Sequence, residues 1–129
     1  KLPHLDSSAA QHRTNAEHYN QLFAEKALDA DVLTTPEIVH DGHVFNQYVI
    51  RTNRRDDLAG HLQELGIGHG IYYPVCLHQQ VCFDYLGYKP GDFPVAERVA
   101  DEVLALPVFP ELGAERQARI VDEVVRFLG

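Results

Sequence analysis

The sequence contains no Met and no Trp, and only two of its 129 residues are Cys. Cys76 and Cys82 are too few for a disulfide framework, which favours a reducing compartment. No apolar run approaches the ~20 residues that a membrane-spanning helix needs, and the N-terminus lacks the basic-then-apolar pattern of a secretion signal. We therefore expect a cytoplasmic protein with no membrane partner. Because the chain starts at Lys1 and lacks Met, we expect a processed chain or a piece of something larger.

Basic side chains are scarce as well. Lys and Arg together number 11 against 19 Asp and Glu, so the formal net charge is −8, and both halves of the chain are acidic. Phosphate binding needs clustered Lys or Arg, so we expect no nucleic-acid partner. With 45% apolar and 23% charged residues, the composition is that of one ordinary globular domain rather than a disordered or collagen-like chain.

The periodicity of apolar residues predicts an α/β (α+β) layer: a three- to four-stranded sheet with helices packed mainly on one face. Asp41-Gly42 predicts a hairpin between strands 37–40 and 43–51, because this dipeptide suits a type I′ turn. A further strand is expected over 67–73 and a short extended piece over 106–110. Helices are expected over 7–28, 53–65, 78–86, 94–104 and 114–128. Ser7 or Ser8 should cap the first of these helices and Asn53 the second. The helix over 94–104 should bury Val95, Val99 and Val103.

Two pairs of residues invite a metal or thiol interpretation. His40 and His43 flank the predicted turn, and His78 and Cys82 are spaced i,i+4, but neither pair supplies a third protein ligand. The plainer interpretation is solvated histidines and a buried thiol. A nucleophilic Cys76 or Cys82 would need a cationic setting, which an acidic chain does not favour. We assign no metal ligand and no catalytic residue.

The densest group of informative residues lies in Gly68-His-Gly-Ile-Tyr-Tyr-Pro-Val-Cys-Leu-His78. Tyr and His side chains can hydrogen-bond a polyhydroxylated ligand while their rings stack on its apolar faces. The segment is therefore a candidate lip of a binding cleft. The alternative is that one Tyr belongs to the core and that His78 merely begins a helix.

Several segments together resemble the C-terminal part of the sugar aminotransferase family named after DegT, DnrJ, EryC and StrS. They are Gln47-Tyr-Val-Ile-Arg51, Leu65-Gly-Ile-Gly-His-Gly-Ile-Tyr-Tyr-Pro74, Leu77-His78 with Gln80, Leu86-Gly-Tyr-Lys-Pro-Gly-Asp-Phe-Pro-Val-Ala-Glu97 and Leu106-Pro-Val-Phe-Pro-Glu-Leu112. The resemblance covers essentially the whole chain. It implies residues 1–30 as a helix leading from a missing large domain and residues 31–129 as the C-terminal small domain.

The resemblance implies an enzyme that uses pyridoxal phosphate to aminate a keto sugar on a nucleotide diphosphate, with a large domain that carries the cofactor lysine. Lys1, Lys26 and Lys89 are the lysines of this chain, and none has the family's lysine context. The resemblance therefore implies a fragment that has no cofactor and is inactive alone. Its partners would be the large domain, a second subunit in a homodimer and the nucleotide-sugar substrate. The alternative is a stand-alone binding or interaction module that kept this fold.

The resemblance also places the substrate-side residues. It implies Tyr73 and His78 near the mouth of the substrate cleft, with Tyr72 and Gln80 behind them. Many relatives have His at the position of Tyr72 and also at that of Asn46, so these two departures bear on which sugar is held. If the chain is a fragment, its exposed apolar face should associate with a partner, and the first helix is the expected place.

Overall fold

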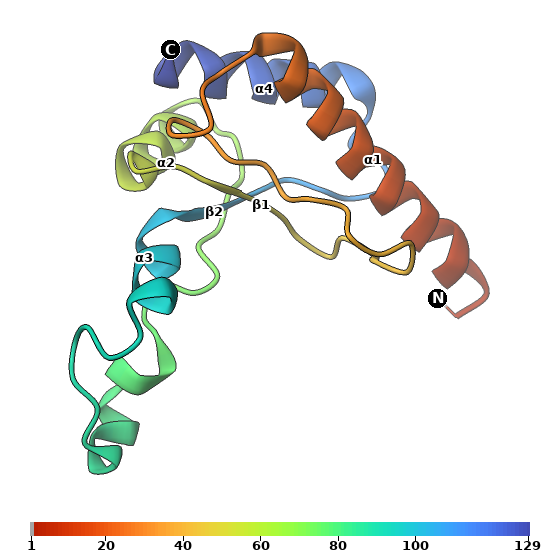
Figure 1. Ribbon diagram of the computed structural model, residues 1–129. Helices are drawn as coiled ribbons and strands as arrows, with labels where there is room; N and C mark the ends of the chain where they lie inside the picture. Colours follow the sequence, from red (N-terminus) through yellow and green to blue (C-terminus); the bar gives the residue numbers. More distant parts are fainter. Residues whose placement is uncertain (1) are drawn as a thin grey trace.

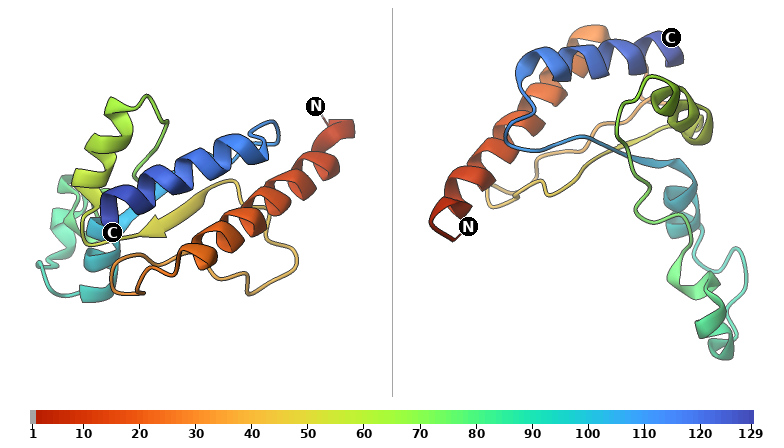
Figure 2. Two further views of the ribbon diagram at one scale, coloured as in Figure 1. Left: turned by 90° about the horizontal axis from the view of Figure 1, so that it is seen from above. Right: turned by 180° about the vertical axis from the view of Figure 1, so that it is seen from behind.

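Helices from the two ends of the chain lie side by side over a small sheet (Figures 1 and 2). The computed structural model describes residues 2–129, without the side chain of Leu2. Its elements are η1 (Leu2–His4), α1 (Leu5–Lys26), β1 (Tyr48–Arg51), α2 (Arg55–Glu64), η2 (Leu77–Gln79), η3 (Val81–Leu86), α3 (Pro94–Glu102), β2 (Val103–Leu106) and α4 (Ala114–Leu128). The helices α1, α4 and α2 pack together above the sheet, and α3 lies below it. The predicted α/β class, with helices mainly on one face, is confirmed.

The sheet is smaller than the sequence predicts. β1 and β2 form an antiparallel ladder from the Tyr48–Leu106 pair to the Arg51–Val103 pair. Single residues extend it at each edge, because Thr34 bridges Arg51 and Gly70 bridges Ala105. The sheet therefore has two regular strands rather than the predicted three or four, with one isolated bridge at each edge. The segment 67–73 forms this one bridge rather than the expected strand.

The predicted hairpin around Asp41-Gly42 is wrong. In the described part of the chain, residues 37–40 form no strand, and Gly42 lacks the positive φ that a type I′ turn requires. Instead the Gly42 N–H donates to Nδ1 of His40 at 2.8 Å, and the Phe45 N–H donates to Nδ1 of His43 at 3.1 Å. The His43 N–H also donates to the His40 carbonyl at 3.1 Å, so a turn forms at the predicted place, but no strand pairing follows it and β1 begins only at Tyr48.

The core lies between the sheet and α1, α2 and α4. Tyr19 of α1 stacks on Tyr48 of β1 with ring centroids 4.7 Å apart, and both side chains are fully buried. The Tyr19 hydroxyl donates to the Pro107 carbonyl at 3.0 Å, and the Tyr48 hydroxyl donates to Oδ1 of Asn20 at 2.6 Å. Burial raises the pKa of both phenols well above the ordinary value, so both stay protonated and keep donating.

Some local expectations are corrected. Neither Ser7 nor Ser8 caps α1: its first residue is Leu5, and the Ser7 hydroxyl donates to the His4 carbonyl. The cap of α2 is Arg54, whose N–H is accepted by the Thr52 hydroxyl, rather than Asn53. Each helix therefore starts within two residues of the predicted position, and neither N-terminus has a side-chain cap hydrogen bond.

The region of the third and fourth predicted helices differs more. Residues 78–86 form parts of two 3₁₀ helices, η2 and η3, which are separated by the extended residue Gln80, rather than one α-helix. α3 ends at Glu102, so the predicted member Val103 belongs to β2. Val95 was expected to be buried but is 65% exposed, because no element covers that side of α3. α4 matches its predicted range, with Ile120, Val121, Val124 and Leu128 buried.

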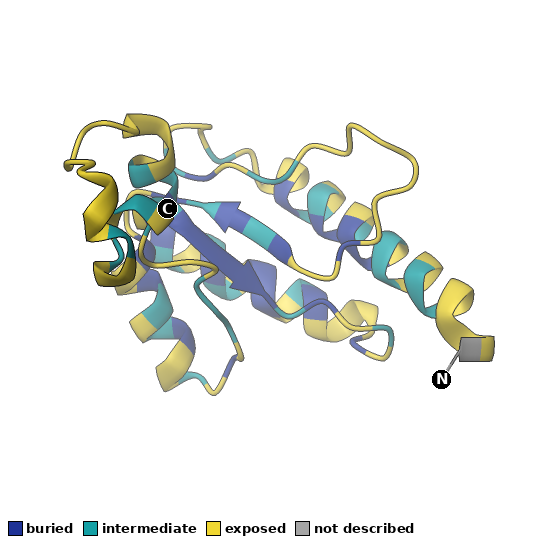
Figure 3. Cartoon of the chain, turned by 90° about the horizontal axis from the view of Figure 1, so that it is seen from below, coloured by how far each residue is buried: buried dark blue, intermediate teal, exposed yellow. Residues whose placement is uncertain are grey.

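The segment 71–99, which we call the arm, projects away from the rest of the molecule, which we call the body (Figure 1). None of the residues 68–99 is buried, whereas the body has a continuous core (Figure 3). The arm holds ten of the fifteen large apolar side chains that are exposed in the described part of the chain: Tyr72, Tyr73, Val75, Leu77, Val81, Tyr85, Leu86, Tyr88, Phe93 and Val95.

The helices of the described residues include none that is both long and apolar enough to cross a membrane.

Candidate functional site

A groove runs between the segment 72–80 and α3, and three of the four predicted site residues line it. Tyr72, Tyr73 and Gln80 form one wall, and the apolar side chains of α3 form the other, around a volume of about 400 Å³. Tyr73 is the most open of the three, with 72% of its surface exposed. The structure therefore brings Tyr72, Tyr73 and Gln80 together at a solvent-accessible surface. We call this space the apolar groove.

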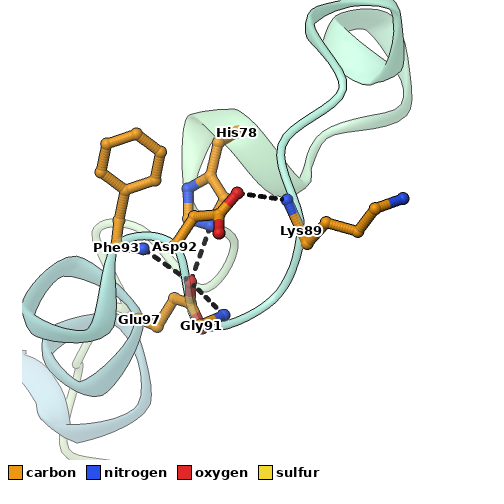
Figure 4. A network of polar contacts seen from close by, with 6 residues as sticks. All are labelled: His78, Lys89, Gly91, Asp92, Phe93 and Glu97. Carbon is orange, nitrogen blue, oxygen red and sulfur yellow. Dashed lines mark hydrogen bonds and ion pairs between the residues drawn. The ribbon is translucent and has the colours of Figure 1, made fainter.

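His78, the fourth predicted residue, lies outside the lining of the apolar groove. Its side chain is only 8% exposed, and its Nε2 lies 2.9 Å from Oε1 of Glu97 (Figure 4). Because a carboxylate only accepts hydrogen bonds, Nε2 is the protonated nitrogen. The imidazole packs against the rings of Phe93, 4.8 Å away between centroids, and Tyr88, 6.5 Å away. His78 therefore joins η2 to α3 and to the loop before it.

Glu97, in the first turn of α3, accepts hydrogen bonds from two further groups. The Gly91 N–H lies 2.9 Å from Oε1 and 2.8 Å from Oε2, and the Phe93 N–H lies 3.3 Å from Oε1. The hydrogen bond from Gly91 is the main cause that lowers the pKa of Glu97, with His78 and Phe93 adding to it against a smaller desolvation effect. One carboxylate thus fixes three segments of the arm, in a region that has no buried core.

A second space, which we call the polar pocket, lies on the other side of Tyr72. Asn46, Gln47, His69 and Tyr72 line it over a floor that includes Gly70, and its volume is about 330 Å³. Nδ1 of His69 lies 3.0 Å from the Ile67 carbonyl, which fixes Nδ1 as the donor and leaves Nε2 as an acceptor. Sequence reasoning missed Gln47 and His69 as site residues. The closely spaced glycines of the segment 66–70 were the available sign of a close approach.

Tyr72 separates the two spaces, because it lines both. A Cβ at Gly70 would lie 2.8 Å from Cε2, Cζ and the hydroxyl oxygen of Tyr72, so this ring position requires glycine. The Gly70 N–H and carbonyl are bonded to Ala105 of β2, at 3.1 and 2.7 Å. Tyr72 and Asn46 both line the polar pocket.

The described residues contain no group of three or more His, Cys, Asp or Glu side chains that could hold a metal ion. Cys76 lines the apolar groove, and Sγ of Cys82 lies 3.9 Å from Oε1 of Gln80. His78 and Cys82, paired by their sequence spacing, thus contact different side chains, Glu97 and Gln80.

Comparison with known proteins shows which family this chain resembles. A family model described as the DegT/DnrJ/EryC1/StrS aminotransferase family matches residues 1–125. The "Pleiotropic regulatory protein" of Geobacillus stearothermophilus is 46% identical over 129 residues, which cover 98% of this chain and 34% of that protein. The UDP-N-acetyl-3-dehydro-alpha-D-glucosamine 3-aminotransferase of Acidithiobacillus ferrooxidans is 38% identical over 128 residues, or 99% of this chain and 33% of that one.

A solved structure agrees with these relatives. S. venezuelae DesV superposes with a TM-score of 0.89 at 31% identity, over 98% of this chain and 33% of DesV. The chain thus spans about a third of the length of the curated relatives that it matches. With the match over residues 1–125, the chain belongs to the DegT/DnrJ/EryC1/StrS aminotransferase family.

Proposed function

We propose that the chain is the C-terminal small domain of a pyridoxal phosphate-dependent nucleotide-sugar aminotransferase, with residues 1–30 as the linking helix and 31–129 as the small domain. The observation that carries the proposal is the match to the family over residues 1–125, at about a third of the relatives' length. The intact enzyme would transfer an amino group to a keto sugar in the cytoplasm and would act as a homodimer.

The arm supports a missing large domain as the main partner. Ordering a residue costs roughly 1–2 kcal/mol of backbone conformational entropy, which proteins offset chiefly by burying apolar surface. The arm has no buried residue, and its large apolar side chains face solvent. A surface of this kind marks an interaction site. The proposal therefore assigns the contact surface to the arm rather than to α1, whose exposed side includes the polar residues Gln11, Glu17 and Gln21.

The lysines of this chain support placing the cofactor lysine in the missing domain. Lys26 is an exposed residue on α1 that pairs with Asp122 at 2.7 Å. Lys89 is exposed in the turn before α3, where its N–H donates to Asp92 at 2.8 Å. Neither lines the apolar groove or the polar pocket, and Lys1 lies outside the described residues. These residues do not fit a pyridoxal phosphate site, so the proposal has the cofactor bound elsewhere and the chain inactive alone.

On the substrate side, the proposal gives direct contacts to Tyr73, Tyr72 and Gln80, which share the apolar groove. His78 contributes by holding η2 against α3 through Glu97, because its side chain is almost wholly enclosed. The acidic chain disfavours the diphosphate of a nucleotide sugar, so those phosphates would bind to the large domain.

The test compares two polypeptides from the same genome: the 129-residue chain and its reading frame extended upstream of Lys1. The extended product should show the visible absorbance of bound pyridoxal phosphate, aminate a nucleotide-linked keto sugar from Glu or Gln, and elute as a dimer. The 129-residue chain should show no absorbance of bound pyridoxal phosphate and should not aminate the sugar. A start codon close to Lys1, with no cofactor domain in frame, would refute the proposal.

A stand-alone binding module is the second candidate. The closed core of the body favours it, and so does the regulatory name of the Geobacillus relative. This candidate predicts a monomer that stays soluble at high concentration without any partner. Concentration-dependent association through the arm would count against it.

A further inference from the structure

A further pocket, which we call the charged pocket, lies between α3, the turn after α1 and the segment 51–53. Its lining combines side chains of both charges with hydroxyls and an amide: Asp31, Glu102, Arg51, Arg98, Thr34, Thr52 and Asn53. It shares no lining residue with the apolar groove or the polar pocket. Its volume of about 210 Å³ is below the ~300–1,000 Å³ that is usual for ligand pockets, so it suits a small molecule rather than a nucleotide.

Two of the four charges in this pocket are paired with each other. Nε of Arg51 on β1 lies 3.2 Å from Oε2 of Glu102 at the end of α3. The other two, Asp31 and Arg98, are both exposed, and no hydrogen bond or ion pair within residues 2–129 engages their side chains. One negative and one positive group are therefore left for a ligand.

The pocket also has hydrogen-bonding groups to spare. Nε of Arg51 is enclosed but has no hydrogen-bond partner in the described residues, although buried polar atoms normally have one. The buried Thr52 hydroxyl accepts the Arg54 N–H at 3.3 Å, which leaves its own hydrogen free to donate. The amide of Asn53 is exposed at the rim. A polar ligand can thus meet donors and acceptors beside the two free charges.

The mixture of charges selects the class of ligand. An isolated anion such as phosphate would be repelled by Asp31 and Glu102, and an isolated metal cation by Arg51 and Arg98. A free α-amino acid carries one carboxylate and one ammonium group on the same small molecule, so it matches the two charges that are left. Ala30 is the only apolar residue in the lining of this described pocket, which favours an amino acid with a short polar side chain.

We propose that the charged pocket binds a free α-amino acid with a short polar side chain, with its carboxylate at Arg98 and its ammonium group at Asp31. Arg98 belongs to the arm and Asp31 to the body, so the bound amino acid ties the arm to the body. The pocket is thus an effector site that stiffens the arm. The proposal does not depend on the proposed function, because it uses neither the apolar groove nor a cofactor.

The test titrates the ¹⁵N-labelled 129-residue chain with L-serine and with two analogues that each lack one charge, L-serinamide and N-acetyl-L-serine. Serine should shift the amide signals of residues 31, 52, 53 and 98 and should bind more tightly than either analogue. Arg98→Gln should weaken serine about 1.5- to 5-fold, the range for an exposed ion pair, and leave serinamide unchanged. Asp31→Asn should weaken serine by a similar factor and leave N-acetylserine unchanged. Arg116→Gln, which removes an exposed guanidinium of α4 outside the pocket, is the matched control and should bind serine like the parent chain.

The site would be overturned by the absence of saturable shifts at residues 31, 52, 53 and 98, or by serine binding no more tightly than its analogues. An equal loss of serine affinity in Arg98→Gln and Arg116→Gln would overturn it as well. The link between arm and body is measured by ¹⁵N relaxation, because bound serine should raise the order parameters of residues 71–99. Unchanged order parameters would refute the effector role. Failure of the proposed function would leave the serine titration unaffected, since every residue of the charged pocket belongs to the 129-residue chain.

Discussion

Gly70→Ala would place a methyl group in space that the Tyr72 ring occupies. The new Cβ would lie 2.8 Å from two ring carbons and the hydroxyl oxygen of Tyr72, whereas nonbonded carbon atoms rest about 3.5–4.0 Å apart. The ring must therefore move by about 1 Å. Tyr72 is 47% exposed, so it can move into solvent, and the bonds of residue 70 to Ala105 use only the backbone and should persist.

The matched control is Gly68→Ala, whose Cβ would meet no atom within 4 Å. Neither glycine has a positive φ, so both substitutions should gain about 0.4–1 kcal/mol from the lower entropy of the unfolded chain. The difference between the two variants in free energy of unfolding, measured by urea denaturation, then reports the cost of moving the Tyr72 ring. We expect Gly70→Ala to be less stable than Gly68→Ala by about 1 kcal/mol.

Proton NMR distinguishes ring movement from general damage. In Gly70→Ala the Tyr72 ring resonances should shift and show contacts to the new methyl group, while Gly68→Ala should leave that ring unchanged. Unchanged Tyr72 signals in Gly70→Ala would refute the reasoning. So would a loss far above 3 kcal/mol, because an exposed ring that can move does not carry so large a cost.

Three further results are expected. Acidification should break the hydrogen bond from the Gly91 N–H to Glu97, which is the main cause of the lowered pKa of this carboxyl group. The stabilisation is complete above the ordinary carboxyl pKa and is lost as pH falls through the lowered value. The amide NMR signal of Gly91 should therefore shift over that pH range and stay constant in Glu97→Gln. Gln117→Leu should cost about 1–3 kcal/mol in the free energy of urea unfolding, because it deletes one buried and one half-buried hydrogen bond between α4 and α1. Gln21→Leu on the exposed side of α1 should change stability by less than about 0.5 kcal/mol. Brief chymotrypsin digestion followed by mass spectrometry should show cleavage after the exposed Tyr85 or Tyr88 before any cut in the body, and an initial cut inside α1 or α4 would contradict the division into arm and body.

The sequence predicts the helices of the body well because their apolar spacing records the face that packs on the core. Ile120, Val121, Val124 and Leu128 recur at helical spacing and are all buried in α4. The strands were harder, since their pairing depends on residues far away. The Asp41-Gly42 signal concerned local turn geometry: the His43 N–H does donate to the His40 carbonyl, but residues 37–40 form no strand to pair across this turn.

Which of the predicted site residues lie together was predictable in part, again because some of them are neighbours in the sequence. Tyr72, Tyr73 and Gln80 belong to one short segment, so a local reading could group them. Glu97 could not be linked to His78 from the sequence, because the turn that brings the two side chains to 2.9 Å has no periodic signature. Gln47 reaches the polar pocket only through the sheet, whose edge pairing no local pattern specifies.

The arm leaves the sheet just after Gly70 and returns to it through α3 and Val103, two residues before the Gly70–Ala105 bridge. Its two ends therefore meet at one place, and none of its side chains is among the buried residues of the core, against which only Ile71 of the described arm residues packs. A chain built in this way can exchange the whole excursion for one of different sequence or length while the buried core of the body is left intact. Grafting an arm between two bodies should accordingly leave the core of the recipient body unchanged.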